Sequence, residues 1–276
     1  MKHLLLTAAL AATTINLALA QPAAKPKDIV INGVEGFQDT PMQPDGKWHV
    51  HDPARPQPVV VTPGKTFSQQ ATPPSDATVL FDGKDLSQWR DKKSGGDAQW
   101  TVADGVATSA KGDIVTTNKF GDIQLHLEFK EPVPPKESGQ GRGNSGIYFM
   151  GLYEIQILDC YINQTYADGS TGGLYGQHPA LANACRPPGE WSTYDCIFTT
   201  PRFGADGKLV SPAYLTATLN GVVVQNHQAF RGATNWRSLG SYQAHATELP
   251  LLLQYHNNSV SFRNIWVRSV PLVNEP

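Results

Sequence analysis

The chain has 276 residues, a formal net charge of −2 and only 17% charged residues. This sparse, nearly balanced charge excludes the basic stripe that nucleic-acid-binding proteins need, so we expect no nucleic-acid partner. The length suits one large domain with an additional segment.

Residues 1–20 have the composition of a signal peptide. A basic start at Lys2 precedes an apolar run over 4–10, and the segment ends in small residues at Ala20. We expect cleavage after Ala20 and a periplasmic or secreted product. The alternative, a membrane anchor, requires a longer uninterrupted apolar run. No later stretch is apolar enough to span a bilayer, so we also expect no membrane span.

Residues 21–75 are rich in proline and poor in periodic apolar runs. This composition predicts an extended leader arm without a hydrophobic core of its own. Trp48, His51 and the strand-like run over 59–61 could dock the arm on the domain that follows.

From residue 76 the sequence changes to short strand-like runs between turn signals. Asp104-Gly105 and Asn220-Gly221 each lie between alternating residues, which is a strong hairpin signal. The run 123–130 alternates apolar and polar residues, as on a half-buried antiparallel strand. No long stretch has helical periodicity. We therefore expect an all-β domain over 76–271, with two antiparallel sheets in a sandwich or jelly roll, and a short tail at 272–276.

The stretch from Gly139 to Tyr161 carries the candidate site. A glycine-rich segment leads into a strand-like run in which Glu154 and Gln156 share one face, because strand side chains alternate. Ile155 points the other way, into the expected core. A carboxylate and an amide beside the aromatic Tyr148 suit a sugar, whose ring has polar edges and flat apolar faces.

Three cysteines occur, at positions 160, 185 and 196. Cys196 lies in a strand-like run and is expected to be a buried free thiol. Cys160 and Cys185 flank a polar, glycine-rich loop and are the better candidates for a disulfide, which an exported chain permits. Such a bond would stabilise the fold by about 3.5 kcal/mol in the chain-entropy description. The alternative is three free thiols.

Several motifs follow one another along the domain. They are LFDGKDLSQWR (80–90), GNSGIY (143–148), YEIQILD (153–159), GGLYGQHPALANACRPPGEWSTYDCIFTTPRF (172–203), LNGVVVQNH (219–227) and LQYHNNSVSFRNIWVR (253–268). Together they resemble the 3-keto-disaccharide hydrolase family over about 76–271, and the arm over 39–64 is similar to the leader of a common subgroup.

This resemblance implies a concanavalin A-like jelly roll with a substrate groove on its concave sheet. It also implies that the substrates are glycosides whose glucose unit is oxidised to a ketone at C3. Two departures from the family are visible. The family typically carries serine where this chain has Cys160 and Cys185, and their joint departure supports the disulfide interpretation. The family commonly has Asp before its late histidine, where Tyr255 precedes His256 here.

A ketone at C3 acidifies the C2 hydrogen, so the bond at C1 can break by elimination, followed by addition of water. That route needs a base, a partner for the enolate oxygen and an acid for the leaving group. Glu154, Arg142 and His256 are the candidate catalytic residues, and the division of roles stays open. The alternatives are a solvated strand face for Glu154, a turn-shaping role for Arg142 and a structural role for His256.

The candidate substrate-binding residues combine polar groups for sugar hydroxyls with aromatic rings for sugar faces. They are Asn144, Tyr148, Gln156, Asp159, Tyr175, Trp191 and Gln254. For Asp159 the alternative is a loop-capping role, and for Tyr175 and Trp191 it is core packing.

Two other functions remain open on the sequence alone. One is a non-catalytic carbohydrate-binding module. The other is a laminarinase-type glucanase, because the spacing of Glu154, Gln156 and Asp159 is similar to the E-x-D-x-x-E of those enzymes; the amide in the middle makes retaining hydrolysis by two carboxyls a weaker match. No cluster has zinc-ligand spacing, so we expect no cofactor. Calcium held by loop carbonyls and acids stays open, with no residue that marks its site. The oligomeric state stays open.

Overall fold

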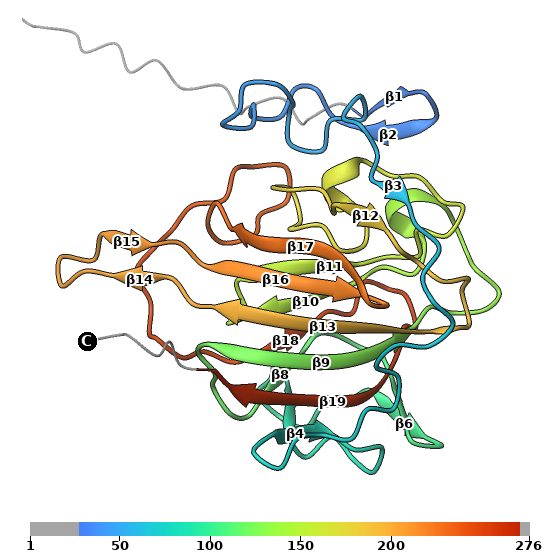
Figure 1. The fold of residues 1–276 in the computed structure, drawn as a ribbon, viewed down its shortest axis with the longest axis vertical. Helices are drawn as coiled ribbons and strands as arrows, with labels where there is room; N and C mark the ends of the chain where they lie inside the picture. Colours follow the sequence, from blue (N-terminus) through green and yellow to red (C-terminus); the bar gives the residue numbers. More distant parts are fainter. Residues whose placement is uncertain (1–27, 271–276) are drawn as a thin grey trace, which may run out of the picture.

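The computed structural model describes residues 28–270 and is nearly all β (Figure 1). The predicted signal peptide (1–20) and the tail (272–276) lie outside the described residues. The helices in the described range are two short 3-10 turns, η1 (Gly139–Gly141) and η2 (Ala167–Gly169). Neither of these turns is long and apolar enough to cross a membrane.

Two antiparallel sheets form the sandwich, as the sequence predicted. The larger sheet has the order β17-β16-β13-β9-β19-β7-β6, with β4 also paired to β19. Its strands are β17 (Val222–Ala229), β16 (Tyr214–Leu219), β13 (Trp191–Thr199), β9 (Ile123–Lys130), β19 (Ser261–Ser269), β7 (Val106–Thr108), β6 (Thr101–Ala103) and β4 (Thr78–Phe81).

The smaller sheet has the order β11-β10-β18-β8-β5 and lies behind the larger one in Figure 1. Its strands are β11 (Tyr153–Ile157), β10 (Ser145–Phe149), β18 (Leu252–Leu253), β8 (Ile114–Thr116) and β5 (Trp89–Asp91). A separate ribbon, β14 (Arg202–Phe203) with β15 (Leu209–Ser211), projects from the sandwich.

The hydrophobic core lies between the two sheets and follows the period of two along each strand. In β9 the odd-numbered residues from Ile123 to Phe129 are buried, and in β11 Ile155 and Ile157 are fully buried. Phe149 of the smaller sheet stacks on Phe198 of the larger one, with ring centroids 4.6 Å apart. Each such side chain contributes about 1.5–3 kcal/mol through burial of apolar surface.

The leader arm packs against the sandwich in three places. Its first part forms the hairpin of β1 (Ile29–Ile31) and β2 (Val34–Gly36), which lies beyond one end of the sandwich in Figure 1. Val34 and Phe37 cluster with Tyr166 of the domain, so the apolar contacts of this hairpin are made to the domain. Further on, β3 (Val59–Val60) pairs in parallel with β12 (Ala182–Asn183).

The last part of the arm covers the outer face of β9. His126 and Glu128 are both fully buried there, whereas the sequence predicted a polar face exposed to solvent. The backbone N–H of Gln70 donates to Glu128 Oε1, and Asn264 Nδ2 donates to the Ala71 carbonyl. Burial opposes ionisation of Glu128, but hydrogen bonds, led by that from His126, lower its pKa to about 2.

Candidate functional site

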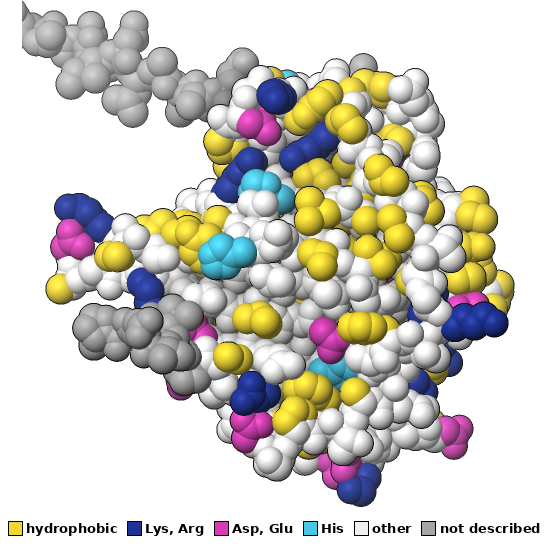
Figure 2. Space-filling model, in the orientation of Figure 1, with side chains coloured by type: hydrophobic (Ala, Val, Ile, Leu, Met, Phe, Trp, Pro, Cys, Tyr) yellow, Lys and Arg dark blue, Asp and Glu magenta, His cyan; other side chains and the backbone are white. Residues whose placement is uncertain are grey.

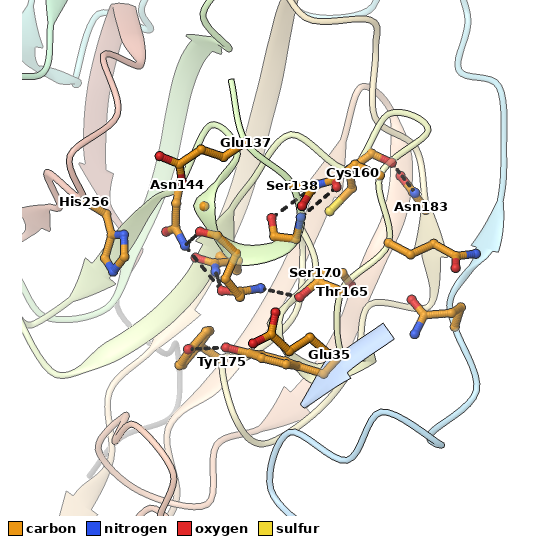
Figure 3. Close-up of a pocket in the computed structure, with 18 of the residues that line it drawn as sticks. Glu35, Glu137, Ser138, Asn144, Cys160, Thr165, Ser170, Tyr175, Asn183 and His256 are labelled. Atoms are coloured by element: carbon orange, nitrogen blue, oxygen red, sulfur yellow. Dashed lines mark hydrogen bonds between the residues drawn. The ribbon is translucent and has the colours of Figure 1, made fainter. Parts of the chain in front are cut away.

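A cavity of about 1200 Å³ opens on the face of the smaller sheet that points away from the core. Tyr148 of β10 and Glu154 and Gln156 of β11 line it, together with the loops around 137–144 and 160–170 and residues of the leader arm. Figure 3 shows how these segments surround the cavity. Its volume lies just above the range of about 300–1,000 Å³ found for small-molecule sites.

The carboxyl of Glu154 is the chemically distinctive group of this cavity. The side chain is only 2% exposed and lies opposite Tyr148 in the β10–β11 register. Burial, with a smaller effect of the Asp113 charge, raises the pKa of Glu154 to about 8, although a hydrogen bond from the Tyr148 hydroxyl acts in the other direction. A carboxyl with a pKa near the working pH is suited to accept and return a proton.

Two neighbours hold Glu154 in place. A side chain at Gly146 would bring its Cβ within 2.4 Å of Glu154 Oε1, so only glycine leaves room for the carboxylate. The backbone N–H of Glu154 donates to Thr234 Oγ1 at 3.0 Å, which ties β11 to the loop after β17.

Two amide side chains, Gln156 and Gln254, line the cavity with their oxygen atoms unpaired. Gln156 Nε2 donates to Gln140 Oε1 at 3.2 Å, and Gln254 Nε2 donates to the Tyr148 hydroxyl at 3.3 Å. The Oε1 atoms of Gln156 and Gln254 are buried and have no hydrogen-bond partner among the described residues. Buried polar atoms are nearly always bonded, so these two acceptors are free for the hydroxyls of a ligand. Asn144, whose Nδ2 donates to the Gln140 carbonyl, lines the same cavity.

A pair of tyrosines forms another wall, and the leader arm supports it. Tyr166 and Tyr175 line the cavity and share a hydrogen bond of 2.8 Å between their hydroxyls. The ring of His51, from the arm, lies 4.0 Å from the Tyr166 ring and bonds Asp168 through Nδ1 at 3.2 Å. Sequence reasoning named Tyr175 but missed Tyr166 and Asp168, because no local signal marks these loop residues.

His256 lies at the rim of the cavity. Strand β18 ends at Leu253, so Gln254 and His256 follow it in a loop, and both line the cavity. His256 is exposed to solvent, and Figure 3 shows it beside Asn144. Of the ten predicted site residues, seven therefore converge here. They are Glu154, His256, Asn144, Tyr148, Gln156, Tyr175 and Gln254.

Arg142, Asp159 and Trp191 lie elsewhere and do not line the cavity. Arg142 Nε donates to Asp159 Oδ2 at 2.7 Å, and the backbone N–H of Tyr161 donates to Asp159 Oδ1. This pair braces a loop, as in the capping alternative for Asp159. Trp191 is on β13, where the guanidinium of Arg263 lies 4.0 Å from its ring centroid. Asp159 thus does not join Glu154 in the two-carboxylate arrangement of a retaining glucanase.

The predicted disulfide between Cys160 and Cys185 is not formed in the structure, which holds both as free thiols, together with Cys196. The two side chains are in contact through a hydrogen bond between their sulfur atoms, and this bond lowers the pKa of Cys160. Thr171 adds a backbone N–H donor to Cys160 Sγ at 3.3 Å. The sequence thus identified the two cysteines that lie in contact. The structure joins them by a hydrogen bond between thiols, whereas we expected a disulfide bond.

Comparison with known proteins agrees with this architecture. The chain is 48% identical to a protein of Parabacteroides distasonis ATCC 8503 that carries a provisional glycosyl hydrolase assignment, with a TM-score of 0.71 over 78% of this chain and 93% of that one. A second crystal structure from the same organism, with the same provisional assignment, is 23% identical with a TM-score of 0.51 over 71% and 94% of the two chains, and supports the fold alone. No curated protein matches the sequence. Residues 76–268 match the family model described as a 3-keto-alpha-glucoside-1,2-lyase-like domain, and the chain therefore belongs to that family.

Proposed function

We propose that this protein is an exported enzyme that cleaves the glycosidic bond of 3-keto-glycosides in the cavity above β10 and β11. The observation that carries the proposal is the buried Glu154 carboxyl with its pKa raised to about 8, placed among unpaired amide oxygens. Membership of the 3-keto-alpha-glucoside-1,2-lyase-like family supports the 3-keto substrate. The signal-peptide composition of residues 1–20 supports export.

The first half of the reaction is an elimination. Glu154, ionised, removes the C2 proton, and the electron pair of that C–H bond moves through the enolate to form the C1–C2 double bond. The C1–oxygen bond breaks, and the leaving oxygen takes a proton from His256 at the rim. When Glu154 becomes protonated, it no longer competes for the hydroxyl hydrogen of Tyr148, which can then donate to the developing enolate oxygen.

The second half is the reverse addition, with water in place of the leaving group. His256 takes a proton from a water molecule as the water oxygen bonds to C1. Glu154, whose proton has exchanged with solvent, delivers a proton to C2, which regenerates the ionised carboxyl. The released product is the free 3-keto sugar. Gln156 and Gln254 accept hydrogen bonds from sugar hydroxyls through their unpaired oxygen atoms, and Tyr175 supplies ring surface. Arg142 takes no part in this scheme, because its guanidinium is bound to Asp159.

The test is incubation with 3-keto disaccharides and their unoxidised parents in heavy water. We expect cleavage of the oxidised compounds alone, with deuterium at C2 of the released keto sugar. Glu154→Gln should lose both cleavage and exchange, whereas Glu248→Gln, at an exposed position away from the cavity, should keep both. Cleavage with the original C2 hydrogen retained would instead indicate direct hydrolysis at C1. Binding without turnover in the unaltered protein would indicate a carbohydrate-binding module.

Export has a separate test. Protein recovered from the periplasm or medium should begin at Gln21, and N-terminal sequencing that finds Met1 would contradict the proposal.

A further inference from the structure

A second cavity, of about 360 Å³, adjoins the first. The leader arm forms one of its walls through residues 60–63, and residues 160–162, 185–187 and Glu190 line the others. The two cavities share the lining residues Val60, Cys160, Asn183 and Ile162. They therefore form one continuous groove. Two of the shared residues, Cys160 and Asn183, lie side by side in the first cavity, where Asn183 Nδ2 donates to the Cys160 carbonyl at 3.1 Å (Figure 3).

Hydrogen bonds to the domain fix the part of the arm that lines the second cavity. Val60 pairs with Asn183 in the parallel β3–β12 ladder, and the backbone N–H of Val61 donates to the Asn183 carbonyl at 2.9 Å. Arg186 Nη2 donates to the carbonyl of Gly64 at 2.6 Å. The second cavity is thus a built feature of the docked arm.

Ile162, at the junction of the two cavities, has an unusual conformation for its residue type. Its backbone φ is +50°, in the left-handed region that glycine and asparagine adopt readily and that β-branched residues avoid. Its side chain is 87% exposed, so packing in the core does not compensate for this conformation. A strained backbone that keeps an exposed apolar side chain in a groove indicates a contact with a ligand.

The rest of the lining specifies what kind of ligand fits. Val60 is 76% exposed and Tyr161 38% exposed, and Figure 2 shows apolar side chains at the surface in the region of β3. Arg186 supplies a donor, because its Nε is buried and has no partner among the described residues. Glu190 lies 3.8 Å from the guanidinium and offsets its charge. The lining favours a neutral ring with an apolar face and a hydroxyl on its edge, which describes a sugar.

We propose that this second cavity binds the part of a neutral oligosaccharide substrate beyond its 3-keto ring, with Ile162 as the apolar platform. The inference rests on the proposed function and deepens it, because it assigns the groove a substrate longer than a simple glycoside. Ile162 is then a specificity-determining residue whose backbone strain is retained for a ligand contact.

The test uses a series with the same 3-keto ring and a growing leaving group: a methyl glycoside, a disaccharide and a trisaccharide. In the unaltered protein kcat/KM should rise along the series. In Ile162→Asn we expect the trisaccharide-to-methyl ratio of kcat/KM to fall by about 10-fold, from the lost burial of one apolar side chain. The methyl glycoside should react as before. The Tm should stay equal or rise, because asparagine suits the positive φ.

Matched controls separate this role from a general surface effect. Leu181→Asn makes the same kind of change at an exposed apolar side chain of equal size that lies outside both cavities. This variant should keep the trisaccharide-to-methyl ratio of kcat/KM. Ile162→Val keeps an apolar side chain at this position and should keep most of that ratio. A lowered Tm in Ile162→Asn would identify a packing residue and overturn the inference, as would an unchanged ratio or no rise along the series.

A binding measurement keeps the inference separate from the reaction. Calorimetry with the unoxidised trisaccharide, which needs no turnover, should show binding that Ile162→Asn weakens by about 10-fold. Absence of binding to the unaltered protein would overturn the inference even if 3-keto-glycosides are cleaved. Conversely, binding that depends on Ile162 without cleavage of any oxidised compound would support the groove and refute the proposed reaction.

Discussion

The raised pKa of Glu154 predicts an unusual dependence of stability on pH. A carboxyl with a folded-state pKa of about 8 and an ordinary value of 4.5 binds its proton more tightly in the folded protein. The stability it contributes is fully present below pH 4.5, declines as pH rises and is lost above about 8. Glu154→Gln replaces the carboxyl by an amide of the same shape that cannot ionise, so the variant should lack this decline.

The size of the effect follows from the shift. A difference of 3.5 pKa units, from 4.5 to about 8, corresponds to about 5 kcal/mol at roughly 1.4 kcal/mol per unit. The side chain is 2% exposed, so little of this is screened by solvent. At pH 5 the variant and the unaltered protein should be similarly stable, and at pH 9 the variant should be more stable by up to about 5 kcal/mol.

Urea unfolding of both proteins at intervals from pH 5 to pH 9 measures the difference directly. Contributions of other titrating groups cancel in the comparison, since only position 154 changes. A difference in unfolding free energy that stays constant across this range would show that Glu154 has an ordinary pKa and would remove the main physical support for its role as a base.

Other features of the structure give three further predictions. Gly146→Ala should displace the Glu154 carboxylate and lower kcat/KM by about 100-fold with the fold retained, as circular dichroism can check; Gly96→Ala, where a Cβ has room, should leave activity intact. Glu128→Gln should lower the free energy of unfolding by roughly 3 kcal/mol and release the arm near Gln70, because it removes the negative charge that the buried partners of Glu128 face. Cleavage of the arm by protease that is no faster than in the unaltered protein would contradict this. Thiol titration in denaturant without reductant should count three free cysteines, and a count of one would demonstrate a disulfide.

The sequence by itself determined the arrangement of side chains about each strand. Glu154 and Gln156 face the cavity and Ile155 faces the core because side chains alternate along a strand, a rule that needs no knowledge of neighbours. The same rule located the core of the run 123–130. The two-sheet fold followed from many short strands and hairpin signals, and the family from motifs along the domain.

Only the tertiary structure decided which loops meet and what each charged group pairs with. The residue type of Arg142 predicts a partner for the enolate oxygen, but the fold of the loop pairs its guanidinium with Asp159 instead. His51 lies 117 residues before Asp168 and reaches it only because the arm docks on the domain.

The polar face of β9 shows the same limit. Its alternation predicts an exposed polar face, yet His126 and Glu128 are buried beneath the arm. The physical reason is that strand alternation is a short-range property of the backbone. Burial, pKa and the shape of a groove depend instead on contacts between segments distant in the chain, which no local spacing of residues specifies.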